Sequence, residues 1–589
     1  MAEAAGYVLR VEGVNFSSTV TDTQDISVIR GAGLALLHAA DRVQAILDAK
    51  LGQGVAEQVF AGASQAAFRF RADSETATAV LHDLRGKLAT EGEDPRDLAG
   101  QLEAHGGDPT ATMREGMIPL AHLSFVCDLA HDGEALPDGD KQRDALDRAL
   151  YAAEARNRTR QMQSLTVPLP KFEQGVLGFD PVDKLRPAVP KIPGIAKQTR
   201  EAADAQGVPA TAAPATAARR LYGRKMRKAF YGVELGEPID EPVTESVADI
   251  CAVPICGWDR FGVRPSLQNK LAIFYADGNG FGAIRADLAQ HHEPPRMVNA
   301  LAQFSRELQA FRRGFLNRTL EWLRTMGGDD IVRQGRGRVP IRIKDKEELR
   351  LRLETLLWGG DEFTMVVPGW LGFTLAQGFF KLSKDWKIGE KTLTHGAGLL
   401  FCDRKTPIRD ITRLVKEGLA EEAKKHRKDM NALSVAAFES ADLPDDLGAY
   451  RKRLYPNLSG PDAWFVLTAG ELTGLLELIQ RMGNKGEHAR ADRTEFPRSQ
   501  LYKLLRIAQQ TTPFGGNACE DKVCESLREY LGNAGADCAV GADDFKNWGG
   551  DRPLALTLAL IAEYWDYADP FLEGPPTPPL TMPGTGVRS

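Results

Sequence analysis

Two short stretches of the sequence carry acids where apolar strands run into glycine-rich turns. One is "KLAIFYADGNGFG", with Asp277 at the end of the apolar run, and the other is "LLWGGDEFTMVVP", with Asp361 and Glu362 beside two glycines. If the two strands are neighbours, as strand-helix-strand order allows, the acids converge at one edge of a sheet. Mg²⁺ prefers such hard oxygen ligands and keeps places open for water and substrate phosphates. The two stretches therefore predict a metal site that handles phosphates.

The chemistry of such a site is phosphoryl or nucleotidyl transfer, because two bound cations can activate an attacking hydroxyl and stabilise a leaving pyrophosphate. The backbone carbonyl of Gly278 is a further expected ligand, and a bulky nucleotide could approach closely at Gly278, Gly280, Gly359 and Gly360. We expect the carboxylates of Asp277 and Asp361 on adjacent strands, within roughly 4 to 7 Å, so that their repulsion raises at least one pKa. The alternative is two ordinary surface turns, where Gly, Asp and Asn are common.

The bulk composition is that of an ordinary globular protein, with 589 residues of which 43% are hydrophobic and 26% charged. This length exceeds one hydrophobic core, so we expect three or four domains. The net charge of -6 gives no global attraction to nucleic acid or to a membrane. No apolar run would span a bilayer, and the N-terminus does not resemble a signal peptide. Seven thinly spread cysteines favour reduced cytoplasmic thiols over a disulfide framework.

The order of strand-like and helix-like segments divides the chain into five expected parts. Residues 1–165 alternate strands and helices, and residues 248–440 repeat this alternation around the acid-bearing strands. Between them, residues 166–247 begin as a linker rich in Pro, Ala and Gly and end in a basic helical segment. Residues 441–571 are mostly helical, and the tail 572–589 should be disordered.

The two α/β regions look like copies of one another. "VEGVNF" stands where "ADGNGF" stands, "FAGASQAAFRF" parallels "LWGGDEFTMVV", and "LSFVCDLAHDG" parallels "GLLFCDRKTP". Three matches in the same order predict a duplicated fold. In the first copy we assign the acid positions to Glu12, Ala63 and Ser64, so its hairpin lacks carboxylates. We therefore expect only the second copy to hold metal.

These motifs resemble those of a known enzyme family. "GGDEF" matches the signature of the nucleotidyl-cyclase palm fold, and the closer similarity is to the large polymerase-like subunit of type III CRISPR effector complexes. That family has two palm domains, and the second usually carries the active motif after an Asp-Gly-Asp-like turn, which "ADGNGFG" resembles. The stretch "GAGLLFCDRKTPIRDITRLVKEGLAEEAKKHRKDMNALSVAAF" is similar to the later strand, helix and final strand of that palm. The resemblance is strongest from Leu271 to Phe438.

The resemblance implies an α/β fold of two ferredoxin-like palm domains, of which 1–165 is degenerate and 248–440 carries a GGDEF-type site, plus a helical C-terminal domain. It implies a nucleotidyltransferase that joins ATP or another NTP through 3′-5′ bonds with Mg²⁺ or Mn²⁺, as a cyclic-oligoadenylate synthetase of antiviral defence. Asp277 and Asp361 would be metal ligands, with Glu362 a third ligand or a support. The implied nucleotide-binding residues are Asn279, Gly280, Phe281, Gly359, Gly360, Lys424 and Lys428. The implied partners are guide or target RNA, other effector-complex subunits and a downstream receptor for the second messenger, without a membrane.

The sequence also departs from the family. Asn279 replaces the second acid of the Asp-Gly-Asp turn, and the Asp361-Glu362 pair is nearer to diguanylate cyclases. The base and the ring size of the product therefore stay open. A dinucleotide cyclase working outside any guide-RNA complex is one alternative, and a non-catalytic palm-fold scaffold is another. The His-Asp pairs of "AVLHDL" and "DLAHDG" lack the other spaced ligands of an HD nuclease.

Two weaker features lie between the copies. Cys251 and Cys256 of "CAVPIC" are too few for a structural zinc without distant partners, so we favour two buried thiols. The expected RNA-binding residues form a basic cluster interleaved with aromatic residues: Arg219, Arg220, Arg224, Lys225, Arg227 and Lys228. Such a cluster could grip RNA through charge and stacking, or it could be a solvated helix face.

Overall fold

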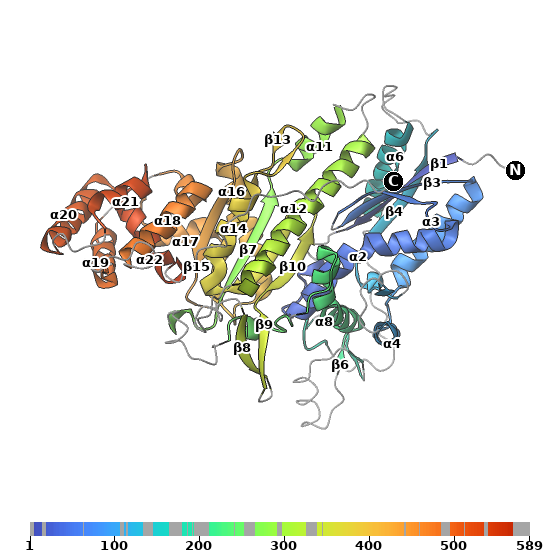
Figure 1. Cartoon of the computed structure of the whole chain (residues 1–589), viewed down its shortest axis with the longest axis horizontal. Helices are drawn as coiled ribbons and strands as arrows, with labels where there is room; N and C mark the ends of the chain where they lie inside the picture. Colours follow the sequence, from blue (N-terminus) through green and yellow to red (C-terminus); the bar gives the residue numbers. More distant parts are fainter. Residues whose placement is uncertain are drawn as a thin grey trace.

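The computed structural model describes most of the chain, and the following paragraphs concern those residues alone. They are 5–14, 19–62, 64–105, 111–112, 116–133, 145–163, 179–184, 186–190, 192–193, 211–240, 242–252, 265–290, 297–325, 338–343, 346–440, 443–458, 460–483, 495–511, 513–534 and 540–568. The tail expected to be disordered and Cys256 lie outside them. A four-stranded sheet stands at one end of the long axis, a six-stranded sheet in the middle, and a helical bundle at the other end (Figure 1).

The first sheet is antiparallel, in the order β2-β3-β1-β4. Its strands are β1 (Ala5–Gly13), β2 (Glu57–Ala61), β3 (Gln65–Ala72) and β4 (Phe125–His131). The accompanying helices are α2 (Ile26–Leu51), α3 (Ser74–Thr90), α4 (Pro95–Ala104) and α6 (Ala145–Gln163). The long α2 begins at Asp25, whose carboxylate accepts from the amides of Ser27 and Val28 and so caps the helix.

The second sheet has the order β10-β11-β7-β14-β15-β16. Its strands are β7 (Lys270–Gly278), β10 (Glu354–Gly359), β11 (Glu362–Pro368), β14 (His395–Asp403), β15 (Ala432–Ala437) and β16 (Val466–Thr468). The helices around it are α11 (Phe281–Gln290), α12 (Met297–Thr325), α14 (Gly372–Ser383), α15 (Ile408–Arg413), the π-helical η4 (Leu414–Ala420) and α16 (Glu421–His426). β16 comes from the range expected to be helical, because three residues are too few to show a strand periodicity.

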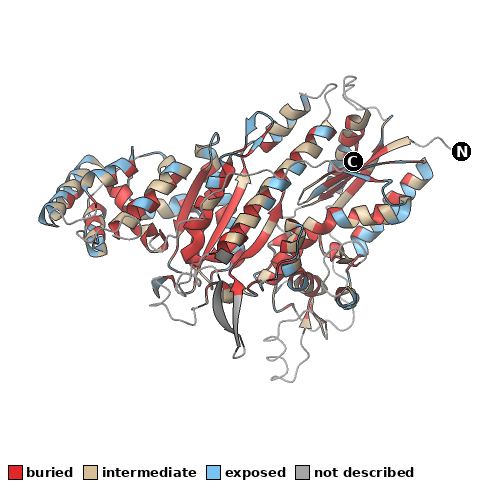
Figure 2. Cartoon of the chain, viewed as in Figure 1, coloured by how far each residue is buried: buried red, intermediate tan, exposed pale blue. Residues whose placement is uncertain are grey.

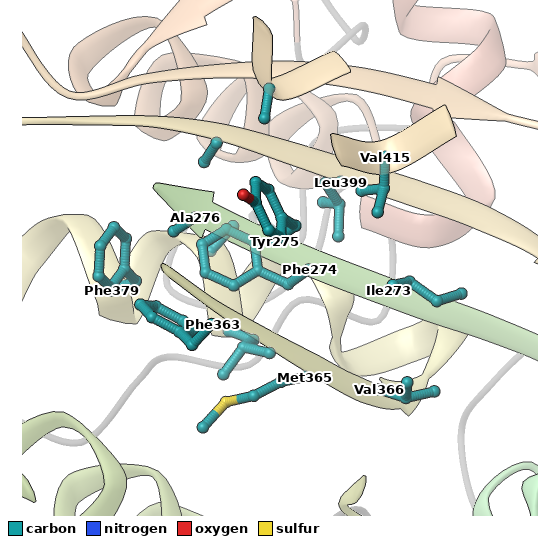
Figure 3. Packing of buried hydrophobic residues seen from close by; sticks show 14 of the residues in the cluster. Ile273, Phe274, Tyr275, Ala276, Phe363, Met365, Val366, Phe379, Leu399 and Val415 are labelled. Atoms are coloured by element: carbon teal, nitrogen blue, oxygen red, sulfur yellow. The ribbon is translucent and has the colours of Figure 1, made fainter. Parts of the chain in front are cut away.

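The faces of β7 are buried differently. Phe274 points to one side of the sheet, where its ring lies 5.9 Å from that of Phe363 and 5.4 Å from that of Phe379. Tyr275 points to the other side, the side on which Val415 and the rest of η4 lie (Figure 3). Strands buried on both faces read as continuous apolar runs, which explains "KLAIFYA". Figure 2 shows these central strands as the most continuously buried part of the molecule.

The remaining elements connect or flank the two sheets. They are β5 (Val189–Pro190), β6 (Thr211–Ala212), α8 (Pro214–Leu235), α9 (Val247–Ile250), and the hairpins β8 (Arg338–Ile343) with β9 (Lys346–Leu351) and β12 (Lys387–Ile388) with β13 (Lys391–Thr392). The bundle contains α17 (Leu447–Leu454), α18 (Ala469–Met482), α19 (Arg498–Gln509), α20 (Asn517–Ala534), α21 (Ala542–Gly549) and α22 (Leu554–Ala568). The apolar α22 is buried nearly all round, and no helix among the described residues could cross a membrane.

The predicted duplication is confirmed by topology, since β2-β3-β1-β4 repeats as β10-β11-β7-β14. The register corrects one detail. Glu12 pairs with Gln65 as Asp277 pairs with Glu362. The amide of Gly13 donates to the carbonyl of Ser64 at 2.6 Å, just as that of Gly278 donates to Asp361 at 3.2 Å. Ser64 and Gln65 are therefore the counterparts of the two hairpin acids.

The assignment of those positions to Ala63 and Ser64 was wrong by one residue, because strand pairing and not the glycine spacing fixes the register. Ala63 itself lies outside the described residues. The conclusion drawn from the comparison is unchanged, since the hairpin of the first copy has no acid at either position.

Each copy packs its long helix on the outer strand of the other copy. α2 lies on β10, where Arg30 donates its Nε to Oε1 of Glu354 at 2.6 Å and both side chains are buried. The approach is close at Gly33, whose Cβ would stand 2.6 Å from the carbonyl oxygen of Leu356. α12 lies on β2, where the hydroxyl of Ser305 donates to a main-chain carbonyl of β2 at 2.8 Å. The two copies therefore form one continuous core.

Candidate functional site

The acids of the two motifs meet on neighbouring strands. Asp277 ends β7, and its Cα partner across the ladder is Glu362, the first residue of β11. Asp361 precedes Glu362 in the two-residue turn of the β10-β11 hairpin, and its carbonyl accepts from the amide of Gly278. The predicted adjacency of the two acid-bearing strands is confirmed. The separation of the two carboxylates stays a prediction.

Asp277 is half-buried and is held by a lysine. Its Oδ2 contacts the Nζ of Lys424 from α16, the residue expected near a nucleotide triphosphate. Burial raises the pKa of Asp277 to about 6, and the charges of Asp361 and Glu362 add to the rise while Lys424 opposes it. The expected pKa increase is therefore present, but desolvation contributes more to it than repulsion does.

Glu362 is directed toward a different pair of side chains. Its Oε2 accepts from the hydroxyl of Tyr275 at 2.5 Å and from Nζ of Lys416 at 2.9 Å. Tyr275 and Asp277 are two residues apart on β7 and so share a face, which the alternation of strand side chains could have predicted. Lys416 sits in η4, and a π-helical turn cannot be read from residue periodicity. This arrangement matches a supporting role for Glu362 better than that of a third ligand.

The turn after β7 is fixed by its own polar groups. Asn279 donates its amide to the carbonyl of Thr394 at 2.8 Å and its side-chain Nδ2 to the Oγ1 of Thr394 at 3.1 Å. Gly280 follows with a φ of 66°, which an L side chain rarely adopts. Lys428 lies in the exposed loop beyond α16, and its carbonyl accepts from the same Thr394 hydroxyl at 3.1 Å.

Phe281 does not lie at the surface of this site. It is 2% exposed, its ring lies 5.4 Å from those of Phe304 and His395, and it fills the space where Gly278 lacks a Cβ. Its expected contact with a nucleotide is therefore wrong for this structure. A phenylalanine after a glycine-rich turn is apolar enough to enter the core, and here it supports the turn from below.

The basic cluster is largely internal. Arg219 is fully buried and donates to the carbonyl of Thr19 at 2.8 Å, Arg220 pairs with Asp25 at 3.0 Å, and Arg227 is half-buried. The aromatic residues interleaved with them, Tyr222, Phe230 and Tyr231, are buried. Only Arg224, Lys225 and Lys228 of the cluster are exposed. The expectation that all six basic residues contact RNA while the aromatic residues stack on its bases is wrong, because α8 packs against α2 along this face.

Cys251, the described one of the two cysteines considered for zinc, gives no support for a zinc site. Cys251 is buried, its Sγ donates to the carbonyl of Val247 at 3.2 Å, and burial raises the pKa of its thiol to about 11. A thiol that resists ionisation is a poor metal ligand.

The donor set at the sheet edge fits magnesium in its chemistry. Asp277 and Asp361 offer oxygen ligands, and the pKa of Asp277 is raised mainly by burial, which a bound cation would offset. Lys424 pairs with Asp277, and Lys416 pairs with Glu362. In the part of the chain that the structure describes, no three His, Cys, Asp or Glu side chains are grouped to hold an ion. A cation would therefore bind at Asp277 by displacing Lys424.

A large open cavity lies on the other side of α16, between this helix and the bundle. Its volume is about 1400 Å³, and Lys424, Lys428 and Arg451 line it. Acids line it too, among them Glu417 and Asp445, so its charge is balanced. Lys424 thus contacts Asp277 and also lines this cavity.

Known proteins identify the second copy. Residues 270–433 match the protein family described as Cas10/Cmr2, second palm domain. No curated relative matches the sequence. The fold is similar to that of Csm1 in T. onnurineus, with 13% identity and a TM-score of 0.52, over 95% of this chain and 70% of that chain.

Two further solved structures are similar over nearly the whole chain. A Csm1–Csm4 cassette in complex with pppApApA has 14% identity and a TM-score of 0.52, and one in complex with cA3 has 13% identity and a TM-score of 0.51. Each match covers 96% of this chain and 70% of that chain. At these identities the likeness shows a mixed α/β fold with palm domains, and with the matched segment it confirms the resemblance to the large Cas10-like subunit of type III CRISPR complexes.

Proposed function

We propose that the second palm joins nucleoside triphosphates, most simply ATP, into a cyclic or linear oligonucleotide second messenger in CRISPR-type antiviral defence. The observation that carries this proposal is the meeting of Asp277, at the end of β7, with the neighbouring hairpin turn that holds Asp361, while Lys424 contacts Asp277. The similar Csm1–Csm4 structures with pppApApA and cA3 support adenine nucleotides as the substrate class. Guide or target RNA and other effector subunits are the proposed partners.

In the proposed reaction the 3′ hydroxyl oxygen of one nucleotide forms a bond to the α-phosphorus of another. The bond from that phosphorus to the β-phosphate oxygen breaks, pyrophosphate leaves, and the hydroxyl proton passes to solvent water. Asp277, Asp361 and the carbonyl of Gly278 would hold Mg²⁺ or Mn²⁺, which when bound activates the hydroxyl and stabilises the leaving pyrophosphate. A ring closes when the last 3′ hydroxyl attacks the first α-phosphorus of the same chain.

The protein's own residues have separate tasks in this scheme. Lys424, released from Asp277, would place its ammonium against the triphosphate and compensate the charge of the departing pyrophosphate. Lys416 and Tyr275 hold Glu362 in place, so Glu362 supports the hairpin turn. Gly280 and Gly360, with φ of 66° and 58°, let the backbone approach the nucleotide closely.

The test is incubation of the purified chain with each labelled NTP and Mg²⁺ or Mn²⁺, with and without guide-target RNA and partner subunits, followed by mass spectrometry. We expect oligoadenylate and pyrophosphate from the wild type and neither from Asp277→Asn. A dinucleotide formed without RNA would favour the cyclase that works alone. Absence of every product in the assembled complex would reject the enzymatic proposal in favour of a scaffold.

A further inference from the structure

α12 runs directly behind the hairpin turn that carries Asp361. Arg312, in the middle of this helix, is 8% exposed and donates its Nη1 to the carbonyl of Gly360 at 2.5 Å. The helix itself passes between the two sheets, in contact with β2 on one side and α14 on the other (Figure 1). A guanidinium from outside the second sheet therefore reaches the turn of its outer hairpin.

The burial of this guanidinium is unfavourable by itself. Burial lowers the pKa of Arg312, and only the charges of Glu234 and Asp361 oppose that change. Its Nε has no hydrogen-bond partner among the described residues, and Arg312 lines a cavity of about 230 Å³ together with His38 and Ser305. A buried cation with incomplete bonding costs stability, so a role beyond folding would explain why an arginine stands here.

The turn has few other bonds to keep it in place. Asp361 lies outside the strand ladder, because β10 ends at Gly359 and β11 begins at Glu362. Its carbonyl bond to the amide of Gly278 holds the side toward β7. On the other side, the indole of Trp358 donates to Glu234 of α8 at 3.0 Å, and Arg312 holds the carbonyl of Gly360.

We propose that Arg312 is a positioning residue, which fixes the Gly360–Asp361 peptide and so aims the Asp361 carboxylate at the site formed with Asp277. The effect of this role on catalysis rests on the proposed function. The effect on structure, which is that the turn stays ordered only while the guanidinium donates to Gly360, is independent of the proposed function.

The experiment compares Arg312→Met and Arg312→Lys with a matched buried arginine. Arg352 is fully buried and donates Nη1 to two carbonyls, those of Ile250 at 2.8 Å and Ala252 at 2.7 Å, away from the hairpin turn. Arg352→Met therefore removes the same kind of interaction without touching the turn. The measurements are the melting temperature, hydrogen exchange of the Gly278 amide in the protein without nucleotide, and kcat and KM for nucleotide consumption.

We expect Arg312→Met to speed exchange at Gly278 and to lower kcat by on the order of 10²-fold at nearly unchanged KM, as for a misplaced catalytic group. Arg312→Lys should recover part of both effects, because an ammonium can still donate to Gly360. Arg352→Met should lower the melting temperature without either effect. Unchanged Gly278 exchange in both Arg312 variants would overturn the inference, whether or not the wild type makes product. If the wild type makes no product but Arg312→Met still exchanges faster than the wild type, only the proposed function is overturned.

Discussion

Arg10 donates its Nε to Glu12 on the first sheet, at the position that Asp277 occupies on the second. Glu12 also accepts from Gln161 of α6 at 3.3 Å, where Asp277 has Lys424 of α16. The acid of the first copy is thus neutralised within its own strand, and its hairpin brings Ser64 and Gln65 instead of carboxylates.

We predict one metal-dependent nucleotide site per chain from this difference. Titration of a non-hydrolysable ATP analogue in Mg²⁺ should give a single site that Asp277→Asn abolishes. Glu12→Gln should leave the stoichiometry and the affinity unchanged. Two equivalent magnesium-dependent sites in the wild type would contradict the prediction.

The two hairpin acids should differ in importance. Asp361→Asn should remove activity, whereas Glu362→Gln should lower it by about 10- to 100-fold, the range for groups that orient a ligand. The reason is that Glu362 bonds to Tyr275 and Lys416. Initial rates of pyrophosphate release measure the difference, and circular dichroism checks that both variants are folded. Equal losses would assign Glu362 a direct role.

Activity should fall on the acid side as Asp277 takes up a proton. Burial raises the pKa of this carboxyl to about 6, so kcat/KM should rise as the pH increases through about 6. Lys424 lowers that pKa, so Lys424→Met should move the acid limb to higher pH as well as reduce the rate. Lys425→Met, on the exposed neighbour, serves as the control with an unmoved limb. A limb that stays in place in Lys424→Met would argue against Asp277 as the titrating group.

The close contact of α2 with α8 should make Gly31 intolerant of any side chain. A Cβ at Gly31 would stand 1.7 Å from the carbonyl oxygen of Arg219, so Gly31→Ala should lower the free energy of unfolding by about 1–3 kcal/mol or more. Gly86 lies exposed inside α3 with nothing within 4 Å of its Cβ position. Gly86→Ala should raise stability by about 0.5–1 kcal/mol. Urea unfolding measures both changes.

The sequence was sufficient to predict that the strands carrying the two acid motifs are neighbours, because each motif is a local pattern of an apolar strand followed or preceded by a glycine-rich turn. It was insufficient wherever partners come from distant segments. Arg219 looks exposed by its residue type and Phe281 by its place beside a glycine-rich turn, yet α2 covers the first and the core encloses the second. Lys416 and Arg312 reach the site from two helices. The side that each helix turns toward the site depends on its packing, and residue spacing does not predict that orientation.

Each palm packs its long helix on the outer strand of the other palm, and this has a consequence for whether the two palms could be separated. The outer strands β10 and β2 are each covered by a helix from the opposite copy. α2 lies against the main-chain carbonyl of Leu356, and α12 lies against that of Ala61. An uncovered sheet edge invites pairing with other chains. Removal of the copy that has no acid pair would therefore leave β10 of the other copy as an uncovered outer strand. The copy without the acid pair is thus a structural part of the other copy's fold, whatever chemistry each of them carries.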